Sequence, residues 1–201
     1  MLEVPPTIRL PRKEELPNNP EVFERLKDRE NANIVQGFIL KENTTHDLPF
    51  KYYAEVNIDN SRLWDLFIEL SQNLPESVSF IYNEYEEDPS YGNYSNKTEI
   101  IKFLENYKVE LTQDCFLEWG LITDETNLLE EVFIADSKYV KVWGNNEVEF
   151  RQSMAAFDLQ EISTLNFIDE FPKVVEALTM HNNNAKPTYL LIQEFSDYFK
   201  S

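Results

Sequence analysis

Apolar residues recur at two different spacings along the chain, and the order of these spacings constrains the fold most. Alternating apolar residues indicate half-buried strands, and apolar residues repeated at helical spacing indicate amphipathic helices. The alternating segments predict strands at 34–40, 52–58, 78–82, 116–123, 131–135 and 139–143. The helical segments lie at 21–29, 63–74, 100–111, 150–157, 165–178 and 192–199. This order predicts an α+β fold, with an antiparallel or mixed sheet and helices packed on one face.

Connections between these segments indicate how they are joined. The loop at 42–49 joins two strands that can pair as a hairpin, and 136–138 is short enough for a tight hairpin turn. Residues 83–94 form a loop with Pro89 and Gly92 as turn formers. Pro172 is expected to break or kink the helix at 165–178, because proline lacks the backbone N–H.

The N-terminal residues differ in composition from the rest of the chain. Prolines stand at positions 5, 6, 11, 17 and 20. Each of them fixes φ and removes a backbone donor, which favours an extended arm. We therefore predict a Pro-rich arm with a short helix at 1–32 and a single α+β domain at 33–201.

Charge excludes several classes of partner. The chain has 18 Lys and Arg against 37 Asp and Glu, a net charge of −19. Residues 1–50 hold seven basic and nine acidic residues, so the net charge of the remaining residues is −17. Direct nucleic-acid binding and an anionic membrane surface both require clustered Lys and Arg, so neither partner is expected. One cysteine, no apolar leader and no apolar run near 18 residues predict a soluble, cytoplasmic protein.

No catalytic, metal-binding or cofactor-binding motif is present in the sequence. Cys115 begins an apolar strand, where a buried thiol is expected, and His46 and His181 have no orienting partner nearby in sequence. The four glycines are isolated, so no phosphate loop exists. We assign the tryptophans Trp64, Trp119 and Trp143 mainly to the core. The sequence therefore predicts no catalytic residue, no metal and no cofactor.

Negative charge is densest between residues 84 and 136, with fourteen acidic residues against three lysines, a net charge of −11. Acids and tyrosines alternate at the start of this segment, and clustered carboxylates attract a basic partner while tyrosines supply rigid contact area. A solvated acidic face with half-buried tyrosines is the simpler alternative. The candidate partner-binding residues are Glu84, Tyr85, Glu86, Glu87, Asp88, Tyr91 and Tyr94.

A strongly acidic α+β chain with one cysteine and this Tyr-acid loop resembles the immunity proteins that bacteria make against toxins. The resemblance is one of general character and rests on no family motif. It implies a non-enzymatic inhibitor that occludes a basic partner protein, such as a toxin domain. In that role Glu84, Glu86, Glu87 and Asp88 would meet Lys or Arg of the toxin, and the three tyrosines would act as anchors.

Two other functions remain open from the sequence. A structural or adaptor subunit would use its apolar surface for self-association, with the acidity serving solubility. A hydrolase would use two of the 37 acidic side chains as a carboxylate pair within about 5 to 10 Å of one another. The oligomeric state is not determined by the sequence.

Overall fold

The computed structural model describes residues 2–45 and 47–200, and it confirms the α+β class. Its main element is an eight-stranded antiparallel sheet with the strand order β2-β3-β9-β8-β7-β4-β5, in which the short β6 also pairs with β4. The strands are β2 (Gly37–Glu42), β3 (Tyr52–Asn57), β4 (Ser77–Glu84), β5 (Ser90–Tyr91), β6 (Ser95–Asn96), β7 (Leu117–Glu125), β8 (Leu128–Ile134) and β9 (Val140–Gly144). Both predicted hairpins, β2–β3 and β8–β9, are present.

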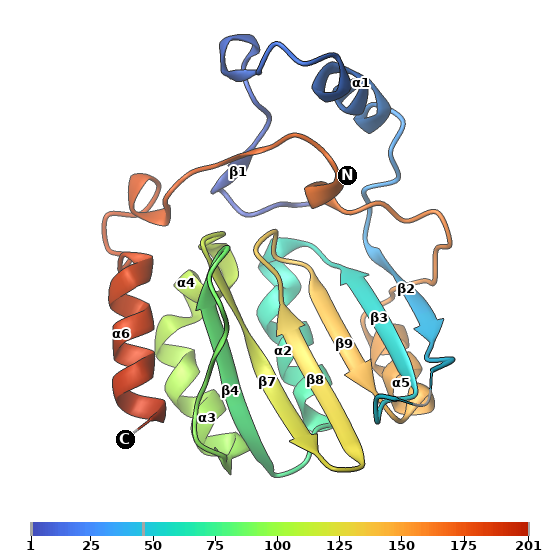
Figure 1. Cartoon of the computed structure of the whole chain (residues 1–201), viewed down its shortest axis with the longest axis vertical. Coiled ribbons are helices and arrows are strands. Elements are labelled where there is room, and N and C mark those ends of the chain that lie inside the picture. The colour runs from blue at the N-terminus through green and yellow to red at the C-terminus, as the bar shows by residue number, and fades with distance from the viewer. Residues whose placement is uncertain (1, 46, 201) are drawn as a thin grey trace.

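The helices pack on one face of this sheet, as the sequence predicts (Figure 1). They are α2 (Leu63–Gln72), α3 (Lys97–Leu104), α4 (Lys108–Gln113), α5 (Glu147–Ala156) and α6 (Thr188–Phe199). The opposite face, which we call the open face, carries no helix in Figure 1. The segment predicted as one helix at 100–111 is divided between α3 and α4 by a 3-10 turn at Glu105–Tyr107.

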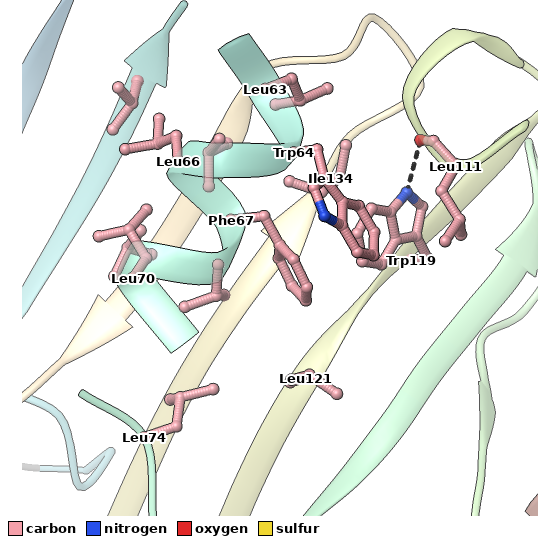
Figure 2. Close-up of a cluster of buried hydrophobic side chains, with 14 of the residues drawn as sticks. Leu63, Trp64, Leu66, Phe67, Leu70, Leu74, Leu111, Trp119, Leu121 and Ile134 are labelled. Carbon is pink, nitrogen blue, oxygen red and sulfur yellow. Dashed lines mark hydrogen bonds between the residues drawn. The ribbon is translucent and has the colours of Figure 1, made fainter. Parts of the chain in front are cut away.

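Aromatic and aliphatic side chains between α2 and the central strands form the core (Figure 2). Trp119 of β7 is completely buried, and its ring lies 4.5 Å from that of Phe67 on α2. The indole Nε1–H donates a 2.8 Å hydrogen bond to the carbonyl of Leu111. Helical spacing on α2 and alternation on β7 thus place both apolar faces in the same layer.

The N-terminal arm is attached to the C-terminal part of the chain. Strand β1 (Ile8–Arg9) pairs antiparallel with β10 (Val174–Val175), and Arg9 forms ion pairs with Glu15 and Glu176. Helix α1 (Pro20–Arg29) follows a 3-10 turn at Lys13–Glu15 and buries none of its residues. Figure 1 shows α1 above the strand ends, away from the core.

The predicted helix at 165–178 is wrong. This segment forms two 3-10 turns, Ile168–Glu170 and Leu178–Met180, with β10 between them. Its apolar residues pack elsewhere: Leu165 and Phe167 lie against Tyr139, at one end of the open face. Pro172 has no backbone N–H and restricts the residue before it, so sheet pairing with the arm replaces helical hydrogen bonding.

Candidate functional site

The acidic part of the predicted loop forms an exposed turn at the end of β4. The amide of Glu87 donates to the carbonyl of Glu84, and Glu86 has a positive φ of 70°. All four acidic residues, Glu84, Glu86, Glu87 and Asp88, are exposed. Within residues 2–45 and 47–200, none of their carboxylates lies within 4 Å of a basic side chain. These charges are therefore not compensated by a neighbour in the fold.

The three tyrosines of the loop are also on the surface. Tyr85, Tyr91 and Tyr94 are 44%, 52% and 49% exposed. The Tyr94 hydroxyl accepts a 2.8 Å hydrogen bond from the amide of Asp124, which fixes the ring against the β7–β8 hairpin. Tyr91 lies on β5 opposite Ile81 of β4. The preceding Tyr82 points the other way and is buried in the core.

The structure arranges these residues along one edge of the sheet. The acidic turn begins three residues beyond Ile81, the partner of Tyr91. Because a strand rises about 3.3 Å per residue, the turn starts roughly 10 Å from Tyr91 along the edge. Tyr91 therefore lies beside β4 and Tyr94 against the β7–β8 hairpin, whereas the four acids are gathered at the end of β4.

Strand register places a row of paired residues across the open face. Tyr91 pairs with Ile81, Ile81 with Gly120, and Gly120 with Phe133. A Cβ built on Gly120 would lie 3.1 Å from the Phe133 ring, so the absence of a side chain lets this ring lie over β7. Paired residues share a face of the sheet. The row that begins at Tyr91 thus leads to an aromatic surface that sequence reasoning missed.

A second row runs beside the first and contains the third tryptophan. Ile122 pairs with Glu131, Glu131 with Trp143, and Trp143 with Tyr53. The rings of Trp143 and Tyr53 are 4.9 Å apart. Trp64 and Trp119 are core residues, but Trp143 is half-buried on the open face, so its assignment to the core was wrong. The sequence shows that Trp143 occupies an alternate position of a strand, but it does not show which face of the sheet the helices cover.

Glu131 stands in the middle of this aromatic surface. Burial among these neighbours raises the pKa of its carboxyl to about 7, against the opposing effect of Lys141. Lys141 does not form an ion pair with it, and its ammonium lies 5.3 Å from the ring of Tyr139 instead. No hydrogen bond or ion pair to the Glu131 side chain occurs in the described part of the chain. A carboxyl group without a partner on an apolar surface is energetically unfavourable.

Two hollows of the surface contain acidic side chains and are candidate sites for the carboxylate pair of a hydrolase. One hollow of about 460 Å³ lies between the arm and residues 169–174, and its Glu15 is bound to Arg9. This pairing lowers the pKa of Glu15 to about 2, which is unsuited to a general acid. A hollow of about 370 Å³ beside β2 contains Glu55, Asp169 and Glu170. Each of these three carboxylates already accepts a hydrogen bond, from Tyr53, Tyr139 and Asn166 respectively.

Nucleophilic side chains are engaged in structural contacts. Cys115 is buried, which raises the pKa of its thiol, and it accepts a hydrogen bond from Thr7. Ser137 donates to Asp136, and Lys173 contacts both of them while forming a 2.7 Å ion pair with Asp136. These contacts fasten residues 169–174 to the turn of the β8–β9 hairpin.

Of the two histidines, His181 lies within the described residues. The Nε2 atom of His181 lies 2.9 Å from a carboxylate oxygen of Glu176, five residues earlier, so the expectation that His181 has no partner nearby in sequence is wrong. His46 lies outside the described residues. Throughout residues 2–45 and 47–200 there is no group of three His, Cys, Asp or Glu side chains placed to hold a metal ion. Over the same residues, no helix has the length and apolar character needed to cross a bilayer.

Comparisons with protein families, with characterised proteins and with solved structures found no match for this chain.

Proposed function

We propose that this protein is a non-enzymatic, acidic binding protein that occludes a basic partner protein, in the manner of an immunity protein. The observation that carries the proposal is the exposed acidic turn at 84–88, whose carboxylates have no counterion among the described residues. Half-exposed tyrosines follow directly on the same edge of the sheet. A basic surface could neutralise the acids while packing against the rings.

The two parts of this surface would do different work. Exposed carboxylates act over a distance and mainly accelerate the encounter with a cationic surface. Tyrosine rings act at contact, where they bury area at a low cost in side-chain entropy and slow dissociation. The proposal therefore expects association to depend on the acidic turn, and dissociation to depend on Tyr85, Tyr91 and Tyr94.

The test uses a partner that is first captured from the native host, identified and purified. We expect a variant with Glu86→Ser, Glu87→Ser and Asp88→Ser to bind this partner with an association rate reduced about three- to tenfold at low salt. The effect should shrink as ionic strength rises, because exposed charges are screened beyond about 8 Å at physiological salt. Stopped-flow association at several salt concentrations measures both.

A matched control removes the same number of charges elsewhere. Glu21, Glu24 and Asp28 lie on the exposed face of α1 and form no ion pair within the described residues. The variant with Glu21→Ser, Glu24→Ser and Asp28→Ser has the same net charge as the first variant. Equal association rates and equal salt dependence for the two variants would refute the assignment of the acidic turn as the docking surface.

A self-associating adaptor is the competing function, and the open face favours it. Phe133, Trp143 and Tyr53 form an apolar surface that a second copy could cover. Light scattering at low and high salt separates the two functions. A dimer that persists unchanged at high salt, together with no basic partner on capture, would support the adaptor.

A further inference from the structure

On the open face, the carboxyl group of Glu131 lies among aromatic side chains. Glu131 pairs directly with Trp143 of β9, and the aromatic ring of Tyr53 follows beyond it. Phe133, two residues further along β8, shares the open face with Glu131 and supplies an aromatic ring on a second side. The negative charge of Glu131 also helps to raise the pKa of the Tyr91 hydroxyl, after the larger effect of burial. The carboxyl group is therefore within electrostatic reach of Tyr91 and adjacent to Trp143.

The chemistry of this arrangement selects a cation. Aromatic faces attract ammonium and guanidinium groups, most strongly where water is partly excluded, and a carboxylate adds a charge-assisted hydrogen bond. The aliphatic stem of a lysine or arginine can also cover apolar surface, here Ile122 and Phe133. Glu131 has no such partner within the described residues, since Lys141 is drawn to the ring of Tyr139.

Charge argues against the other occupants of this face. A second copy would bring another chain of net charge −19 against the first, and would bury a second unpaired Glu131 with it. A nucleic-acid strand would meet the same repulsion. A basic protein has the complementary sign and reaches the face along the acidic turn at 84–88.

We propose that the Glu131 carboxylate, with Trp143 beside it on β9 and Phe133 beside it on β8, receives a lysine or arginine side chain of the cationic partner. This inference rests on the proposed function and adds to it the point of direct contact. The acidic turn attracts the partner, and the site at Glu131 holds one of its side chains. Glu131 thus controls dissociation, whereas the turn controls association.

A defined probe tests the site at Glu131 without the partner. Capped hexa-arginine and hexa-lysine are titrated into the full chain, with hexa-citrulline as the uncharged isostere of hexa-arginine. The readout is the ¹H–¹⁵N shift of the Trp143 indole N–H, assigned with the Trp143→Leu variant. We expect the cationic peptides to move this signal in a saturable way and hexa-citrulline to leave it unchanged.

Variants locate the contact. Glu131→Gln keeps the size and polarity of the side chain and should weaken hexa-arginine binding about tenfold, the loss of one charge-assisted contact. Glu24→Gln on α1 removes the same charge far from the open face and should change the affinity less than twofold. Equal weakening by both variants, or no shift of the Trp143 signal up to 10 mM peptide, would overturn the inference.

The same variants separate this inference from the proposed function when the purified partner is used. Glu131→Gln should raise its dissociation rate about tenfold and leave its association rate nearly unchanged. If only the acidic-turn variant is affected, the proposed function stands and the site at Glu131 is rejected. If the indole signal of Trp143 shifts with protein concentration in the absence of peptide, a second copy covers the open face, and the inference is again rejected.

Discussion

Replacing Trp119 with phenylalanine tests whether the layer between the sheet and α2 is the true core. Trp119 is completely buried, and its Nε1–H donates to the carbonyl of Leu111, which is also buried. Phenylalanine leaves that carbonyl unpaired, which costs about 1–3 kcal/mol. The smaller ring also leaves a void beside Phe67 that costs roughly 1–2 kcal/mol. We expect the free energy of unfolding to fall by about 3 kcal/mol.

Urea denaturation followed by circular dichroism measures this loss. With a slope near 2–3 kcal/mol/M, the midpoint should fall by about 1–1.5 M while the slope stays unchanged. Trp143→Phe is the matched control, because that ring lies half-buried on the open face, and its midpoint should fall by less than about 0.4 M. If both variants lose the same stability, the sheet does not carry its core on the side of α2, and the reasoning is refuted.

Three further predictions follow from single residues. Burial raises the pKa of Glu131 to about 7, so its carboxyl binds a proton more tightly in the folded than in the unfolded chain. The free energy of unfolding should therefore fall by about 1–3 kcal/mol between pH 4.5 and 7. Glu131→Gln should remove that fall in urea titrations. Gly120→Ala should lower the melting temperature strongly, because the added Cβ would lie 2.4 Å from the Val132 carbonyl oxygen and 2.8 Å from the Phe133 Cα. A Cβ on Gly92 would lie 2.8 Å from its nearest atom, the Phe199 Cβ of α6. Gly92→Ala should therefore lower the melting temperature less in the same thermal scan. Cys115 should not react with a thiol reagent such as Ellman's reagent at pH 8 until denaturant is added, since burial raises its pKa, and rapid labelling of the native protein would contradict its placement.

The sequence by itself determined the elements whose signals are local. Alternation in β4 and β7–β9, helical spacing in α2 and the short connection at 136–138 depend only on neighbouring residues. The α+β class and the one-sided packing of helices followed from them. The exposure of the acidic turn also belongs here, because consecutive charges with Pro89 beside them cannot be buried without partners.

Only the tertiary structure decided where residues distant in sequence meet. The segment at 165–178 has helical spacing, but its pairing with the arm across more than 150 residues outweighs that local preference. Trp143 has an apolar side chain, and it lies on the open face because the helices cover the opposite face of the sheet. Glu131 was one of 37 acidic residues in the sequence, and register alone places it beside Trp143. Strand alternation tells which residues share a face, but which face is covered depends on the packing of the whole chain.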